Sequence, residues 1–426
     1  MTLPGQRPSL RGSVVWTAVG NSVYLGSQYG MLMAIAKLGT TSLVGEFSLG
    51  LAIVSPVLLF SQMQLRQVLV TDAQRSVPFG AFFWTRAVAG AMALVGTLAA
   101  VALLGYGLDF LLVTGLLGAA KFAESQSDIV YGSLQRRERM DLIAASMVAR
   151  GLLGLGAVAL AVWKTGTLVG ATASLALVWG LVLVCVDLAL LRSGQGPDRL
   201  RWRWDPGVVR GLVRTSAPLT LAAGLGSLSA SVPRYFLEYF RGRAAVGLFA
   251  VAMMPISLMG LFTGAVSQAT LPRASLYLQL GSLAAFHSLA RKVAAVSLLT
   301  GAALVALLAL AGRPLVRALF TSEYESVVPV TIVLGAGVAL SGLAAYGSTV
   351  LSAGRRFTLQ LASVVVGLLV QVPGCILAIP HFGLSGAAWV ELGRFGVTTV
   401  FVQAAGRSVY QGLRHSARSR SEWSAT

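Results

Sequence analysis

The chain has 426 residues, of which 56% are hydrophobic and only 11% are charged. Soluble domains carry about 25% charged residues, so this composition excludes an ordinary soluble protein and predicts a chain that crosses a membrane many times. The net charge of +18 does not indicate a nucleic-acid-binding protein. Most of the excess is arginine in short segments between apolar runs, where basic residues set membrane orientation.

The apolar runs predict an all-α polytopic membrane protein. A membrane-spanning helix needs about 20 mostly apolar residues, and about twelve runs meet this length. In chain order they cover residues 13–36, 46–70, 82–104, 106–133, 142–163, 167–191, 209–232, 246–271, 291–311, 327–352, 357–379 and 383–404. The third and fourth are separated only by Gly105, Gly107 and their neighbours, which predicts a tight hairpin.

The basic residues alternate between the connecting segments. With the N-terminus in the cytoplasm, few of them fall on the opposite side of the membrane: Lys37, Lys164, Arg241, Arg243, Arg313 and Arg317. Most of the others, including Arg75, Arg86 and Arg136, fall in cytoplasmic segments. This bias predicts that both termini are cytoplasmic.

Short motifs of the first half recur in the second half. The matched pairs are residues 44–50 with 246–252, 145–148 with 362–365, and 166–171 with 383–387. Repeats at half the chain length are typical of duplicated transporter folds. Six spans in each half give both halves the same orientation, so the repeats are predicted to be parallel, with a cleft between two six-helix lobes.

The widest polar gap, residues 192–208, is rich in arginine and lies at the midpoint. It is interpreted as the linker between the halves. The predicted organisation is an N-terminal lobe over residues 1–200, a C-terminal lobe over residues 201–406 and a basic cytoplasmic tail over residues 407–426.

The fourth span has the densest set of polar side chains. Lys121, Glu124 and Asp128 are three and four residues apart and therefore share one helix face. Ionisable groups inside spans are functional candidates. Two interpretations stay open: the wall of a water-filled cavity, or an internal Lys–Glu pair that holds helices together. Arg150 in the fifth span is a further buried candidate.

Arg234 and Arg394 are candidates for binding a phosphate, because the guanidinium group makes two parallel charge-assisted hydrogen bonds to such a ligand. Arg234 is followed by Tyr235, a second candidate. The alternative is pairing within the helix, since Glu238 follows Arg234 by four residues and Glu391 precedes Arg394 by three.

Two charged residues lie near span ends. Arg66 is expected to extend its side chain to the membrane surface. Asp187 is expected to pair at the interface with the nearby Arg192.

The first span is polar for a helix that faces lipid. Asn21, Tyr24 and Gln28 share one face. Uncharged hydrogen-bonding groups with an aromatic ring suit sugar hydroxyl groups, and they equally suit packing between helices.

No sequence motif indicates catalysis. The chain contains no Walker loop, no cluster with metal-ligand spacing and no nucleophile triad, so we expect no enzyme activity, no cofactor and no metal.

Several motifs resemble the Wzx-type polysaccharide flippases of the multidrug/oligosaccharidyl-lipid/polysaccharide exporter superfamily. The motifs are Leu38-Gly39 with Gly45 and Phe47, Val246-Gly247 with Phe249, Pro314-Leu315 through Phe320 and Tyr324, Gly354-Arg355-Arg356, and Phe382-Gly383 through Ala388. The resemblance covers nearly the whole chain. It implies a V-shaped, two-lobed bundle that moves lipid-linked sugars across the bacterial cytoplasmic membrane by alternating access.

The expected function is therefore flipping of a saccharide linked to polyprenyl phosphate or pyrophosphate, for cell-surface polysaccharide biosynthesis. Expected partners are the lipid-linked oligosaccharide, membrane lipids, and polysaccharide polymerases or glycosyltransferases, with no nucleic acid. Two alternatives stay open: a small-cation or drug antiporter of the same superfamily, and a membrane glycosyltransferase or ligase. An antiporter would need a lone acidic residue deep in the cavity of the first half, as a proton or sodium switch. A glycosyltransferase or ligase would need a larger folded loop on the outer side.

The predicted topology is tested by reporter fusions at Arg75 and Arg243. We expect the two fusions to report opposite sides of the membrane, with Arg75 in the cytoplasm, because an odd number of spans separates them. Activity of the same reporter at both positions would contradict the span assignment.

Overall fold

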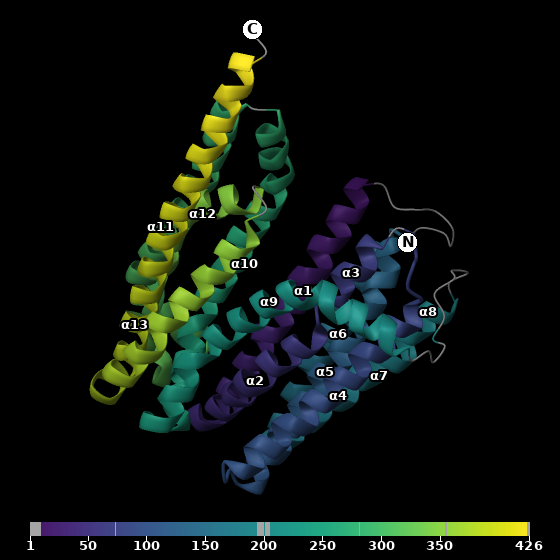
Figure 1. Cartoon of the computed structure of the whole chain (residues 1–426). Helices are drawn as coiled ribbons and strands as arrows, with labels where there is room; N and C mark the ends of the chain where they lie inside the picture. Colours follow the sequence, from purple (N-terminus) through teal and green to yellow (C-terminus); the bar gives the residue numbers. More distant parts are fainter. Residues whose placement is uncertain are drawn as a thin grey trace. The chain divides into compact units, whose positions relative to one another are not determined.

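The computed structural model describes residues 10–72, 74–193, 200, 205–280, 282–353 and 356–423. All regular elements within these residues are helices (Figure 1). Eight of the helices are long and apolar enough to cross a membrane. The predicted all-α polytopic fold is therefore confirmed.

The chain forms two compact units, residues 1–231 and 232–426. The first unit contains α1 (Leu10–Leu38), α2 (Thr41–Gln62), α3 (Leu65–Thr71), α4 (Phe79–Leu103), α5 (Leu108–Arg136), α6 (Met140–Thr165), α7 (Leu168–Leu181), the π-helical turn η1 (Val182–Asp187) and α8 (Leu188–Ser193). The division between the units falls inside α9 (Pro206–Arg241). The second unit continues with α10 (Arg243–Gln279), α11 (Leu283–Leu319), the 3₁₀ turn η2 (Ser322–Val327), α12 (Val328–Ala353) and α13 (Phe357–Trp423).

Each predicted span has a helical counterpart among these elements. Residues 194–199 and 201–204 of the predicted linker lie outside the described residues. The same holds for Arg7 and Arg355. The lobe boundary at residue 200 and the arrangement of the halves as parallel repeats stay predictions. The segment predicted as a separate tail continues α13 as helix as far as Trp423.

The second predicted span is broken near its end. Met63 and Gln64 both have positive φ, 50° and 46°, which separates α2 from α3 and redirects the chain. This conformation is uncommon for residues other than glycine and costs about 1 kcal/mol or more at each position. The break sets the direction of α3, whose second residue is Arg66.

In the first unit, α5 is the central helix and packs against α2, α3, α4 and α7. Because α5 is enclosed by other helices, its polar face meets protein and not lipid. The most extensive packing between two helices of this unit is that of α1 with α6. Small residues allow close approach there, since a Cβ added at Gly20 would lie 2.8 Å from Ala144 Cα.

In the second unit, α13 folds back on itself at Gly383 (Figure 1). Gly383 has φ 56° and ψ −126°, which interrupts the helix between the two spans that the sequence predicts. The two arms pack antiparallel, with Gly374 beside Val390. The Arg241 guanidinium donates hydrogen bonds to the carbonyl groups of Ile379, at 3.4 Å, and Pro380, at 2.6 Å. It thereby satisfies carbonyl groups at the end of the first arm.

Replacing Gly383 with alanine tests this turn. The backbone conformation is nearly restricted to glycine, so G383A should destabilise the protein by about 1–3 kcal/mol and lower the midpoint of thermal unfolding in detergent. The matched control is G393A, because Gly393 is a helical residue of α13 with open space around it. G393A should be neutral or stabilising by up to about 1 kcal/mol. Equal midpoints for the two variants would contradict the role assigned to Gly383.

Candidate functional site

The polar face of α5 pairs its charges over short distances. Lys121 Nζ lies 2.8 Å from a Glu124 carboxylate oxygen, so the predicted internal pair exists. The same Glu124 accepts a short hydrogen bond from the Tyr24 hydroxyl of α1. Lys121 also lies over the ring of Trp179, 5.2 Å from its centroid, and the pair is thereby held between α1, α5 and α7.

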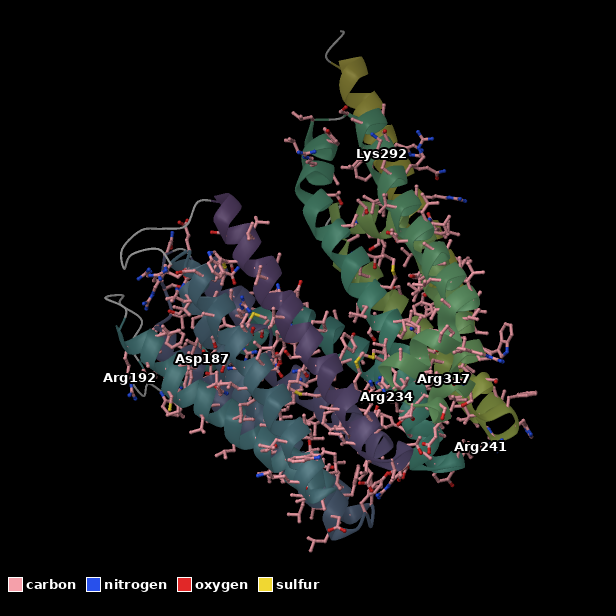
Figure 2. The ribbon with its side chains drawn as sticks, turned by 180° about the vertical axis from the view of Figure 1, so that it is seen from behind. Asp187, Arg192, Arg234, Arg241, Lys292 and Arg317 are labelled. Carbon is pink, nitrogen blue, oxygen red and sulfur yellow. The ribbon has the colours of Figure 1, made fainter. Side chains whose placement is uncertain are left out.

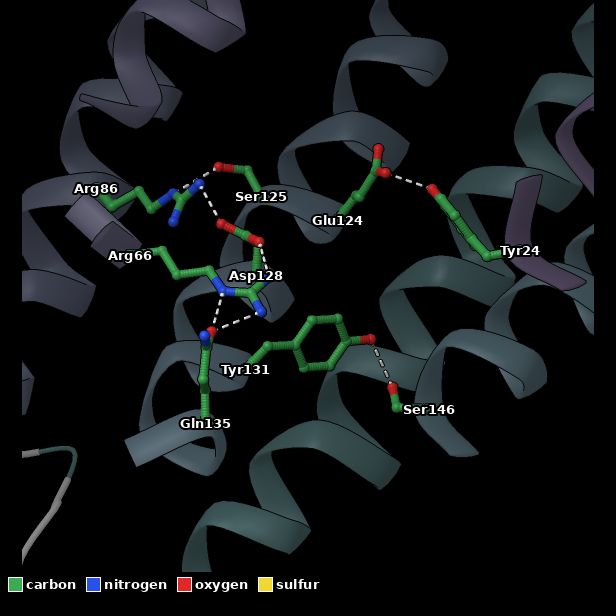
Figure 3. A network of polar contacts seen from close by, with 9 residues as sticks. All are labelled: Tyr24, Arg66, Arg86, Glu124, Ser125, Asp128, Tyr131, Gln135 and Ser146. Carbon is green, nitrogen blue, oxygen red and sulfur yellow. Dashed lines mark hydrogen bonds and ion pairs between the residues drawn. The ribbon is translucent and has the colours of Figure 1, made fainter. Parts of the chain in front are cut away.

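One turn further along α5, Asp128 is shared by two arginines (Figure 3). Arg66 from α3 donates to one carboxylate oxygen at 2.7 Å, and Arg86 from α4 donates to the other at 2.9 Å. A carboxylate that bridges two guanidinium groups leaves one positive charge uncompensated.

Each of these arginines has a further partner on α5. Arg66 donates to Gln135 Oε1 through two nitrogens, at 3.2 and 2.9 Å. Arg86 donates to Ser125 Oγ at 3.0 Å. Arg86 is only 1% exposed, whereas Arg66 is 31% exposed, so Arg66 is the member of the pair that a ligand can reach.

The sequence-based interpretations of Arg66 and Arg86 are therefore wrong. Arg66 does not extend to the membrane surface but turns inward to α5, because the break at Met63 and Gln64 redirects its helix. Arg86 was expected in a cytoplasmic segment, yet it lies in the second turn of α4 with its side chain buried. No spacing within α3 or α4 signals these contacts, since the partner is on another helix.

A second buried ion pair joins Arg150 of α6 to Asp187, at 2.7 Å. The side chains are 2% and 0% exposed. Asp187 also accepts a hydrogen bond from Ser146 at 2.5 Å, and Arg150 donates to Ser127. This pair is closed to solvent and electrically balanced.

Asp187 does not pair with Arg192 as expected. Figure 2 shows Asp187 in the interior of the first unit, with Arg192 at its edge. Asp187 is the last residue of the π-helical turn η1. Such a turn inserts an extra residue into the helix and changes the face on which the following side chains lie.

The ring of Tyr131 lies between the two arginine systems. The guanidinium carbons of Arg66 and Arg150 are 5.9 and 5.8 Å from its centroid, within the range of a cation–π contact. The Tyr131 hydroxyl group is 2.8 Å from Ser146 Oγ. Tyr131 therefore contacts both Arg66, a partner of Asp128, and Arg150, the partner of Asp187.

These groups surround a cavity of about 140 Å³ in the first unit. Its lining includes, among the ionisable or polar side chains, Asn21, Tyr24, Arg66, Glu124, Asp128, Tyr131 and Arg150. Pockets for whole drug-sized ligands are about 300–1,000 Å³. The cavity therefore fits one small polar group, of the size of a phosphate, and not a complete lipid-linked sugar.

The ionisable residues at and behind this cavity carry a surplus of positive charge. The cations are Arg66, Arg86, Lys121 and Arg150, and the anions are Glu124, Asp128 and Asp187. With all of them ionised the sum is one positive charge. An anion can balance this charge.

The structure brings together five of the predicted site residues at the cavity: Asn21, Tyr24, Glu124, Asp128 and Arg150. Lys121 lies behind them as the partner of Glu124. Gln28 is not part of the lining, and its Nε2 atom is buried without a hydrogen-bond partner among the described residues.

The remaining predicted residues, Arg234, Tyr235 and Arg394, lie in the second unit. Arg394 pairs with Glu391 at 2.6 Å, as the alternative interpretation of the sequence expected. Gln371 also donates a hydrogen bond to Glu391. The pairing of Arg234 with Glu238 stays a prediction.

Potential metal ligands do not cluster in the part of the chain that the structure describes. No group of three or more His, Cys, Asp or Glu residues in the described ranges could hold a metal ion. The polar clusters in both units consist of arginine–carboxylate contacts, an arrangement suited to binding anions.

The fold is that of known membrane transporters. It is similar to a multidrug resistance transporter of the MATE family in the MOP superfamily, in its outward-facing form (TM-score 0.68, 16% identity, 96% of this chain and 98% of that chain). The likeness to the inward-facing form has a TM-score of 0.68 at 13% identity, over 97% of both chains. A MOP-superfamily transporter from Pyrococcus furiosus matches with a TM-score of 0.66 at 14% identity, over 96% of this chain and 97% of that chain.

These features define a multi-pass membrane protein with the MOP-superfamily fold. The chain belongs to the polysaccharide biosynthesis protein family, whose model matches residues 35–329. It is 26% identical over 366 residues to the capsular polysaccharide biosynthesis protein CapF of Staphylococcus aureus, over 84% of this chain and 89% of CapF. The family resemblance drawn from the sequence motifs is confirmed.

The buried pair of Arg150 and Asp187 yields a prediction about stability. Removing one partner of a buried ion pair leaves an uncompensated charge and costs about 3–5 kcal/mol. We expect D187A to lower the thermal unfolding midpoint in detergent strongly, and the double variant R150M/D187L to recover at least half of the loss.

The matched control is D109N, because Asp109 is exposed at the start of α5. Its effect should stay within about 0.5 kcal/mol. A midpoint for D187A equal to that of D109N would show that the pair does not stabilise the fold.

Proposed function

We propose that this protein moves a saccharide linked to polyprenyl phosphate or pyrophosphate across the bacterial cytoplasmic membrane. The family, the transporter fold and the polar cavity of the first unit support this proposal. The observation that carries it is the sharing of Asp128 by Arg66 and Arg86, which leaves a positive charge beside a cavity of the size of a phosphate.

In this proposal, the phosphate of the substrate contacts Arg66. The guanidinium group is planar and can give two parallel hydrogen bonds to phosphate oxygens. Asp128 acts as the resident anion that orients Arg66 in the empty cavity, and the phosphate competes with it. Arg86 stays paired with Asp128 when Arg66 turns to the ligand, so the carboxylate always keeps one cation.

The sugar groups next to the phosphate are assigned to the uncharged side of the cavity. Asn21 and Tyr24 of α1 line this side, and both can exchange hydrogen bonds with hydroxyl groups. Glu124 and Lys121 hold the Tyr24 hydroxyl in place. Arg150 is assigned a supporting role, since it is 2% exposed and occupied by Asp187.

Arg234, Tyr235 and Arg394 of the second unit are proposed as further substrate-binding residues. Arg394 is paired with Glu391 at 2.6 Å, and Gln371 donates a hydrogen bond to the same carboxylate. Arg394 is 19% exposed and can reach a ligand, and Tyr235 adds an aromatic group next to Arg234.

The same proposal includes an orientation of the protein in the membrane and a set of partner enzymes. Both termini lie in the cytoplasm, where glycosyltransferases assemble the lipid-linked saccharide, and the export step delivers it to a polymerase on the other side. The chain performs transport and no covalent reaction.

The antiporter alternative is less well supported by the polar groups of the first unit. A proton or sodium switch needs an acidic residue that can change its charge state. Glu124 and Asp128 each lie within 2.8 or 2.7 Å of a cation, which favours a permanent negative charge.

The proposal predicts the effect of replacing Arg66. A charge-assisted hydrogen bond contributes about 1.5–3 kcal/mol, so R66A should lower the rate of transport about ten- to a hundredfold. R66K should retain part of the activity, because lysine keeps the positive charge but cannot donate two parallel hydrogen bonds from a planar group. The measurement is flipping of a fluorescent polyprenyl-pyrophosphate-linked sugar in reconstituted vesicles.

R192A is the control for this experiment, since Arg192 is exposed at the edge of the same unit (Figure 2). Its transport rate should match that of the unmodified protein. If the unmodified protein left the sugar in its starting leaflet under every imposed gradient but exported a small cation, the antiporter function would replace the one proposed.

A further inference from the structure

A second and larger hollow lies entirely within the second unit, on α11, α12 and α13. It has a volume of about 590 Å³. Its polar lining consists of His287 and Arg291 from α11, with Gln403, Arg407 and Gln411 from α13. The rest of the lining is apolar and includes Leu343 of α12. We call this hollow the α11–α13 groove.

The groove presents positive charge without an acidic partner. Among the described residues, its lining contains no Asp or Glu side chain. Arg291 and Arg407 are both exposed, and neither forms an ion pair with another described residue. By contrast, Arg317 and Arg394 of the same unit are paired with Glu325 and Glu391. Two unpaired guanidinium groups beside one hollow create a site for an anion.

The groove lies where the apolar part of the helices ends. The predicted span within α11 begins at residue 291, and the last predicted span, within α13, ends at residue 404. Arg291 and Arg407 therefore lie within about two turns of a span end, at the depth of lipid headgroups. Lys292, next to Arg291, lies at the opposite end of this unit from Arg241 and Arg317 (Figure 2).

An apolar surface continues from the groove along the span. Leu343 in the lining and Val296 one turn beyond Arg291 are each 40% exposed. Leu299, a further turn along α11, is 68% exposed. The combination of cations at the headgroup level and apolar side chains toward the hydrocarbon matches an amphipathic anion.

We propose that the α11–α13 groove binds one anionic phospholipid. Its phosphate lies between Arg291 and Arg407, and Gln403 and Gln411 border the polar headgroup. One acyl chain follows Leu343 and the exposed side of α11. Basic pockets between transmembrane helices recognise anionic lipid headgroups in this way.

The bound lipid links α11 to the last turns of α13. These helices both pack on α12, and a shared phosphate gives their basic ends a common counter-ion. The site is separate from the cavity around Asp128, so it does not depend on which substrate the protein transports.

The test uses the full-length protein, purified and delipidated in a neutral detergent, with short-chain phosphatidylglycerol as the probe. Binding is measured by native mass spectrometry and by the rise in the thermal unfolding midpoint. Each arginine should contribute about fivefold to affinity, so R291Q/R407Q should bind about 25-fold more weakly. R313Q removes an exposed arginine of the same helix outside the groove and should bind like the unmodified protein.

A second variant tests the groove without changing its charge. A295F places a large side chain in the lining, where Ala295 is exposed, and should weaken phosphatidylglycerol binding while the protein keeps its unfolding midpoint without lipid. Equal affinity of R291Q/R407Q and R313Q would overturn the proposal. So would equal binding of phosphatidylcholine, or displacement of the lipid by inorganic pyrophosphate at equal concentration, which would identify a site for soluble phosphates.

Discussion

The structure depends on the requirement that a charge within the membrane find its partner inside the protein, because hydrocarbon offers none. Asp128 meets this requirement twice, with Arg66 and Arg86. These two contacts join α3 and α4 to the central α5. They also leave the site positively charged, so the contact that holds the helices together is the one that prepares the cavity for an anion.

The polar pairs of the molecule fall into two kinds. Arg150 and Asp187 are buried, balanced and closed, and such a pair positions helices without offering anything to a ligand. The Asp128 carboxylate instead contacts two arginines, Arg66 and Arg86, and the Glu391 carboxylate accepts hydrogen bonds from Arg394 and Gln371. In each of these two clusters one arginine, Arg66 or Arg394, keeps a partly exposed guanidinium group.

Two interruptions of regular α-helix set the positions of Arg66 and Asp187. The positive φ angles of Met63 and Gln64 redirect Arg66, and the π-helical turn ends at Asp187. Uninterrupted α-helices would have turned both side chains in other directions. Strained or wider turns commonly occur at functional sites. Here one turn directs Arg66 into the cavity lining, and the other positions Asp187, the partner of the lining residue Arg150. The proposed lipid groove involves no such irregularity, because cations at span ends already lie at headgroup depth.

The sequence alone determined that the protein is an all-α membrane protein, which helices it contains and that α5 carries an interior polar face. These properties are local: apolar runs of spanning length and spacings of three and four residues are visible within one segment. Only the tertiary structure decided that Arg66 and Arg86 meet Asp128 and that Asp187 meets Arg150. Those contacts join residues 37 to 62 positions apart, and they depend on how helices pack and where a helix is broken. No pattern within a single helix encodes such a pairing.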